Sequence, residues 1–121
     1  MYFEFQVQPR QGATWSPTVD VCERASEVVI LVEMPGVERT DVQITWTDGL
    51  LIISGLKRQQ PLNQASAKYL CVERLYGPFR REIAIKVPID YKQAKAELKE
   101  GLLKVHLPKR TEAESANIPI V

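Results

Sequence analysis

Few side chains in this sequence have the type and spacing that catalysis or metal binding requires. His106 is the single histidine, and no nucleophile or carboxylate stands at a characteristic spacing from it. The two cysteines, Cys22 and Cys71, lack the C-x-x-C spacing of a zinc site or a redox pair, so we interpret them as reduced thiols. Gly49 and Gly55 fit hairpins better than a phosphate-binding loop. We therefore expect no catalytic residue, metal or cofactor, and we interpret His106 as a surface strand residue.

The clearest binding feature is apolar and lies at the end of the sequence. Ile118, Pro119, Ile120 and Val121 follow a polar stretch, 111–117, whose largest apolar residue is alanine. In an extended chain, residues two apart point the same way, so Ile118 and Ile120 form a pair. Pro119 biases the segment away from helix. The pair gains stability by filling a slot, on its own domain or on another subunit, so we expect a protein that assembles.

Length, charge and composition narrow the class of protein. The 121 residues suffice for one domain, and 45% apolar with 26% charged residues is typical of a globular protein. The net charge of +1 gives no long-range attraction to nucleic acid or to an anionic membrane. No apolar run approaches the roughly 20 residues of a membrane span. Because the first residues also lack the pattern of a signal peptide, we expect a cytoplasmic protein.

Short β-rich runs between turn residues predict an all-β sandwich or barrel. Val42, Ile44 and Trp46 alternate with polar residues, and Asp48-Gly49 is a strong hairpin signal. The expected strands are an edge strand at 18–23, a central strand at 27–33, then 41–47, 50–55, 69–73, 79–87 and 103–107, with a long loop at 57–68.

Residues 90–99 are ambiguous by sequence alone. Lysine, glutamine, alanine and glutamate favour helix, with Asp90 as a cap and Gly101 as a stop. The apolar stripe of that helix is thin and mostly alanine.

Seven segments in order resemble the alpha-crystallin domain of small heat-shock proteins. The segment from Ala96 to Leu103 is similar to the family signature of Ala, three variable residues, a polar one, Gly, an aliphatic one and Leu. The tail Ile118-Pro119-Ile120 resembles the family's Ile-X-Ile/Val anchor, and the match covers about residues 15–121. The other matching segments are Trp15-Ser16-Pro17, Glu33 to Val37, Asp48 to Gly55, Glu73-Arg74 and Gly77 to Arg81.

The resemblance implies an immunoglobulin-like β-sandwich at 15–109, a short N-terminal arm at 1–14 and a C-terminal extension at 110–121. It also implies a strand at 96–99, preceded by at most a helical turn. The implied function is that of an ATP-independent holdase chaperone that is not an enzyme. Two alternatives remain open: a co-chaperone adaptor resembling the p23 class, and a sandwich module that binds carbohydrate or another small ligand.

The resemblance further implies a homodimer formed by strand exchange. A strand at 69–73 would pair with the partner's 19–23, and Cys22 would then lie near the partner's Cys71. Arg81 has the same parity as the inward-facing residues of its strand. The resemblance implies that it is buried at the dimer interface and paired with a carboxylate, either that of Glu73 or that of another acidic residue. The expected interface residues are Val19, Val21, Cys22, Tyr69, Cys71, Glu73 and Arg81.

Parity and resemblance also nominate a groove for the anchor, between two strands at a sheet edge. One side is formed by Val42, Ile44 and Trp46, and the other by Ala96 and Leu98, although such residues also suit an ordinary core. In the arm, Tyr2, Phe3 and Phe5 suit docking on another surface, including that of an unfolded client, and the alternative is a disordered end.

Overall fold

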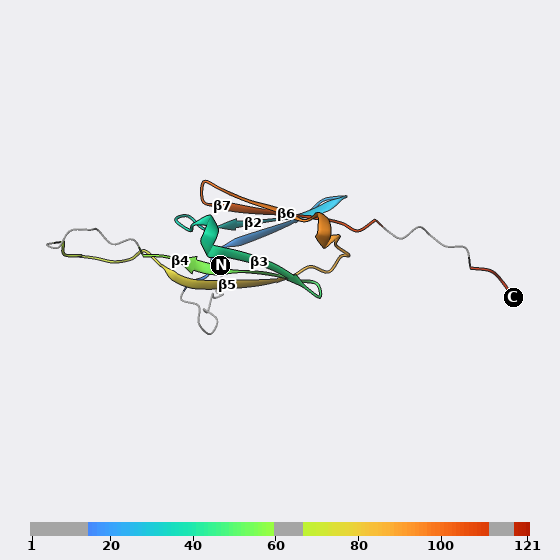
Figure 1. Ribbon diagram of the computed structural model, residues 1–121, viewed down its shortest axis with the longest axis horizontal. Coiled ribbons are helices and arrows are strands. Elements are labelled where there is room, and N and C mark those ends of the chain that lie inside the picture. The colour runs from blue at the N-terminus through green and yellow to red at the C-terminus, as the bar shows by residue number, and fades with distance from the viewer. Residues whose placement is uncertain (1–14, 60–66, 112–117) are drawn as a thin grey trace.

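Two antiparallel sheets pack face to face in the computed structural model, which describes residues 15–59, 67–111 and 118–121 (Figure 1). One sheet has four strands in the order β1-β2-β7-β6, and the other has three in the order β3-β4-β5. The elements are β1 (Val19–Glu23), β2 (Glu27–Glu33), the 3-10 helix η1 (Arg39–Asp41), β3 (Val42–Thr47), β4 (Leu50–Lys57), β5 (Gly77–Ala84), the 3-10 helix η2 (Tyr91–Gln93), β6 (Lys95–Lys99) and β7 (Leu102–Pro108). The predicted all-β sandwich is confirmed.

The core lies between the sheets and is built by alternation along each strand. Strand β2 lies between β1 and β7, as its long apolar run predicted, and Ile30 and Val32 are fully buried. Strand β7 contributes every second residue to the same core, as the predicted alternation requires. The most deeply buried core side chains are Val28, Ile30, Val32, Met34, Leu51, Ile53, Phe79, Leu103, Val105 and Leu107.

The hairpin between β3 and β4 forms where the sequence predicted it. Asp48 and Gly49 have φ angles of 49° and 81°, and positive values at both positions are what a two-residue type I′ turn requires. The register then pairs Thr47 with Leu50 and Trp46 with Leu51. This register keeps the apolar face of β3 turned toward the core.

Residues 90–99 resolve into one short 3-10 turn, η2, followed by strand β6. The strand implied by the resemblance is confirmed, and the helix favoured by propensity is not formed. The reason is tertiary: Leu98 pairs with the buried Leu103 of β7, and Ala96 with the buried Val105. Among the described residues, no helix is long and apolar enough to cross a membrane.

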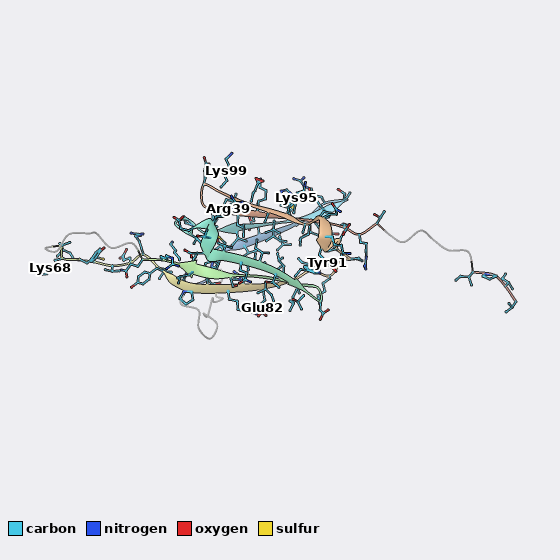
Figure 2. All side chains as sticks on the ribbon, in the orientation of Figure 1. Arg39, Lys68, Glu82, Tyr91, Lys95 and Lys99 are labelled. Carbon is cyan, nitrogen blue, oxygen red and sulfur yellow. The ribbon has the colours of Figure 1, made fainter. Side chains whose placement is uncertain are left out.

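Two of the expected strands differ most from the observed ones, and the ends of several others shift by one or two residues. Strand β5 begins at Gly77 and ends at Ala84, not at Val87, because its partner β4 begins at Leu50, opposite Ala84. The strand expected at 69–73 is not formed within the chain, where residues 67–76 carry no strand. This segment extends beyond the sandwich, with Lys68 far from both sheets (Figure 2). Residues 57–59 lie against part of this segment and line a hollow with it, but no strand pairing forms between them.

Candidate functional site

Two hydrogen bonds show which edges of the two sheets coincide. The Nη1 of Arg81 on β5 donates to the carbonyl of Pro17, just before β1, at 2.7 Å. The indole N–H of Trp15 donates to the carbonyl of Gly77, at the start of β5, at 3.0 Å. The edge strand β5 therefore lies beside the chain that enters β1. The remaining edge strands, β3 and β6, share the opposite edge of the sandwich.

The residues nominated for the anchor groove come together at this shared edge of β3 and β6. Val42, Ile44 and Trp46 are half-buried and pack against the core, as does Leu98 on β6. Ala96 is exposed, although its pairing with the buried Val105 places it on the core-facing side. The edge therefore presents apolar side chains that the domain covers only in part. Binding of the anchor there stays a prediction.

An open hollow continues from Trp46 toward the start of the C-terminal extension, and sequence reasoning missed it. Val87, Ile89 and Tyr91 line it together with Trp46 and Arg110. The backbone N–H of Arg110 donates to the carbonyl of Pro88 at 3.0 Å, so the extension leaves the domain beside this hollow. Of these lining residues, only Trp46 had been nominated from the sequence.

The anchor itself does not use a slot on its own domain. The side chains of Ile118 and Ile120 are 88% and 99% exposed, and Val121 is exposed as well. The C-terminus lies away from the sandwich in Figure 1. Of the two alternatives that the sequence left open, a slot on the same domain is not adopted in this structure.

Most residues nominated for the dimer interface lie in two exposed places, while Val19 is half-buried against the core. On β1, Val21 is 52% exposed although its partner Ile30 is fully buried, and Cys22 is exposed. In residues 67–76, Cys71 and Glu73 are exposed, and so are the large apolar side chains there, Tyr69, Leu70, Val72, Leu75 and Tyr76. Within one chain the structure does not bring these two places together.

Arg81 is half-buried, and its Nη1 donates to the backbone carbonyl of Pro17. The inward parity predicted for it is thus consistent with the structure, because its neighbours Phe79 and Ile83 pack into or against the core. Its expected carboxylate partner stays a prediction.

A bidentate ion pair lies where the chain leaves the sandwich after β4. The Nε of Arg58 lies 2.8 Å from Oδ2 of Asp41, and its Nη2 lies 3.0 Å from Oδ1. Hydrogen bonding from Arg58 holds the pKa of Asp41 below its ordinary value of 3.8, and Asp41 in turn raises the pKa of Arg58. The pair joins η1 to the end of β4, and the sequence alone gave no sign of it.

The Asp41–Arg58 pair predicts a specific pH dependence. Because the folded-state pKa of Asp41 lies below the unfolded one, its contribution to stability is complete above about pH 4 and is lost as the pH falls through the folded pKa. We expect Asp41→Asn to melt below the wild type at pH 7, with the gap closing below about pH 4. Thermal unfolding across that range measures it, and Asp20→Asn, which removes a carboxylate from β1, is the matched control. A gap that widens in acid contradicts the assignment.

His106 lies on the outer face of the four-stranded sheet and has a carboxylate partner that the sequence did not reveal. Its Nδ1 lies 3.1 Å from Oε1 of Glu27, on the neighbouring strand β2. Glu27 is shared with Arg24, whose Nη1 lies 3.1 Å from Oε2. The interpretation of His106 as a strand residue at the surface agrees with this placement, and its carboxylate partner is 79 residues away in the sequence, at no characteristic spacing. Among the described residues, no group of histidine, cysteine, aspartate and glutamate is arranged to hold a metal ion.

The aromatic residues nominated for client contact, Tyr2, Phe3 and Phe5, lie outside the described residues. Their role therefore stays a prediction.

Comparison with known proteins finds the same pattern over nearly the whole chain. The model of the Hsp20/alpha crystallin family matches residues 20–121. Small heat shock protein C4 of Rickettsia felis is 31% identical over 105 residues, which are 87% of this chain and 64% of that protein. The chain thus spans about two thirds of the length of the curated relatives that it matches.

Solved structures agree with the sequence comparison. Heat shock protein 16.0 from Schizosaccharomyces pombe has a TM-score of 0.76 and 34% identity, and the match covers 88% of this chain and 98% of that one. A small heat-shock protein from Xylella fastidiosa, described as having a distinct high order structure, also has a TM-score of 0.76, with 28% identity. That match covers 90% of this chain and 99% of the other.

Proposed function

The chain belongs to the Hsp20/alpha crystallin family, and from this membership we propose that it is an ATP-independent holdase chaperone of the cytoplasm. It binds apolar surface on partly unfolded proteins and limits their aggregation, without turnover and without acting as an enzyme. The observation that carries the proposal is apolar surface left open in a single folded chain. Ile118 and Ile120 are almost fully exposed, and the edge of β3 and β6 is covered only in part.

The proposed mechanism is competition for these open surfaces. In the resting assembly, the anchor of one subunit covers the β3–β6 edge of another, and heat shifts the balance toward uncovered edges. Destabilised clients then occupy them by mass action, which lowers the concentration of free aggregation-prone protein. Each contact is weak, so exchange stays fast and needs no nucleotide.

We propose that the assembly unit is a strand-exchanged dimer. The open edge of β1 and the segment 67–76 support this arrangement, because β1 has one sheet neighbour among the described residues and 67–76 form no strand within the chain. Reciprocal exchange gives both a partner and covers Val21, Leu70 and Val72, which are exposed in one chain. Anchors then join dimers into larger oligomers.

An aggregation assay with a heat-labile model substrate tests the chaperone activity and the role of residues 1–14. We expect the full chain to suppress light scattering in proportion to its concentration, with no effect of added ATP. Removal of 1–14 is expected to weaken protection, because it deletes Tyr2, Phe3 and Phe5.

A variant with all three aromatics changed to serine keeps the length of the arm and separates side chains from chain length. Its protection is expected to match that of the truncated chain, at unchanged particle mass. If the full chain leaves scattering unchanged at a molar excess over substrate, the holdase proposal is wrong. If the truncated chain and the serine variant protect the substrate as well as the full chain does, the client surface lies on the sandwich and not in the arm.

A further inference from the structure

The backbone of β1 has a defined polarity toward its open edge. The carbonyl of Thr18 accepts from the N–H of Glu33, and the N–H of Arg24 donates to the carbonyl of Glu27, so both point at β2. Because backbone groups alternate sides along a strand, those of Cys22 also point at β2, and those of Val21 and Glu23 point at the open edge. A strand added at this edge would therefore meet Cys22 at a position without backbone hydrogen bonds.

The side chains of β1 also alternate between the two faces of the sheet. Val21 pairs with the buried Ile30, so it stands on the core-facing side, while Cys22 pairs with Val29 and stands on the outer face. Both are exposed, and Cys22 is a free thiol. A strand that joins β1 must therefore place its apolar side chains on the core-facing side, beside Val21, and the alternate side chains on the outer face, beside Cys22.

The segment proposed to join β1 has a matching alternation. Leu70 and Val72 are exposed aliphatic residues of one parity, and Cys71 stands between them with the other parity. The apolar face of a strand turns toward the core, so Leu70 and Val72 belong beside Val21. This parity places Cys71 on the outer face, the face that carries Cys22.

We propose that Cys22 forms an intermolecular disulfide with the partner's Cys71, and this inference rests on the strand exchange proposed above. An antiparallel register with Val21 opposite the partner's Val72 brings the two cysteines directly opposite each other. Residues opposite each other at a non-hydrogen-bonded position have Cα atoms about 4.5 Å apart, within the range of about 4.4–6.8 Å that disulfides span. A register shifted by two residues puts the thiols on a diagonal at about 7–8 Å, which is too far.

The bond requires a two-electron oxidant, and a peroxide is the class that suits exposed thiols. One thiolate attacks the peroxide, the O–O bond breaks, and a sulfenic acid and one molecule of water form. The second thiolate then attacks that sulfur, the S–S bond forms, and hydroxide leaves to become a second water. Both thiols lose their protons, and one peroxide is reduced for each disulfide.

The consequence for the protein is a covalent form of its dimer. Reciprocal exchange gives two such disulfides, each joining one protomer to the other. Subunits that otherwise separate are then held together until a thiol reductant reverses the bond. Oxidation at this site thus slows the exchange of subunits, and the core of each sandwich does not change.

Isotope mixing tests the proposal on the full chain. Protein of natural isotope content and ¹⁵N-labelled protein are mixed to exchange subunits, treated with hydrogen peroxide, blocked and digested with trypsin without reductant. Trypsin releases Cys22 in the peptide 11–24 and Cys71 in the peptide 69–74. We expect these peptides as a linked pair with one labelled and one unlabelled half. We also expect a covalent dimer on a non-reducing gel that both Cys22→Ser and Cys71→Ser abolish.

Native mass measured before oxidation tests the non-covalent dimer separately from the disulfide. A non-covalent dimer that yields no 22–71 pair, or only 22–22 or 71–71 pairs, overturns the disulfide and leaves the exchange standing. A linked pair confined to single chains also overturns it. If no dimer exists before oxidation, the exchange fails and the disulfide fails with it. Because both thiols are exposed, the serine variants are expected to melt like the wild type, and oxidation in urea gives the random pairing level for comparison.

Discussion

Replacing Gly55 by alanine is expected to destabilise the domain by several kcal/mol, enough to leave a large fraction unfolded at physiological temperature. A Cβ at this position would lie 2.1 Å from the carbonyl oxygen of Asp41 and 2.8 Å from Cζ of Phe79. Overpacking of a core typically costs about 1–3 kcal/mol, and more where backbone must move. Here the closer obstacle is backbone, and Asp41 is also held in place by its ion pair with Arg58. Thermal and urea unfolding measure the loss.

Two variants show whether backbone crowding is the cause. Ser54→Ala, at the neighbouring position of β4, removes one hydroxyl from the outer face and is expected to change stability little. Phe79→Leu relieves the ring contact and leaves the Asp41 carbonyl in place, so it is not expected to rescue Gly55→Ala. Rescue by Phe79→Leu, or a wild-type melting curve for Gly55→Ala, contradicts the argument.

Most of the strands could be predicted because alternation and turn residues can be recognised within a short stretch of sequence. Alternation in 41–47 identified the face of β3 that packs on the core, and Asp48-Gly49 fixed the turn and hence the register with β4. The unbroken apolar run of β2 predicted a strand with neighbours on both sides, and the sheet order β1-β2-β7 provides them.

Contacts between distant residues could not be read in the same way. The pairs Asp41–Arg58 and Glu27–His106 each join charged residues that look like ordinary surface residues until the sheets fold. Residues 90–99 have helix-forming side chains, and only the partner strand β7 decides in favour of β6.

The candidate site was partly predictable for a related reason. Parity identified the half-buried face of β3, and the inward side of β6 needed the family resemblance as well. That these two strands share one edge depends on the link between β5 and the entry to β1, made by Arg81 and Trp15. The hollow that includes Tyr91 and Arg110 depends on how the chain returns after β7, which no short sequence window contains.

Replacing Ile118 and Ile120 together by alanine is expected to abolish assembly beyond the dimer. Burying an isoleucine side chain contributes about 1.5–3 kcal/mol, and ordering the tail takes back part of the total, so each anchor contact is weak. An oligomer held by several weak contacts depends steeply on each of them, because all of them weaken together in the variant. Native mass and size-exclusion light scattering are expected to show dimers only, with unchanged thermal unfolding, since both side chains are exposed within one chain.

The reciprocal change on the groove tests the same contact from the other side. Ala96 is exposed at the β3–β6 edge, so Ala96→Glu places a charge where the anchor is proposed to sit, without removing a core side chain. It is expected to reproduce the dimers of the double variant, because burying an unpaired carboxylate there is costly. Val121→Ala is the matched control: it shortens an equally exposed apolar side chain of the opposite parity and is expected to leave the particle mass unchanged. Full-size particles in both the anchor variant and Ala96→Glu would show that assembly uses another surface, and the proposed mechanism of covered and uncovered edges would then be wrong.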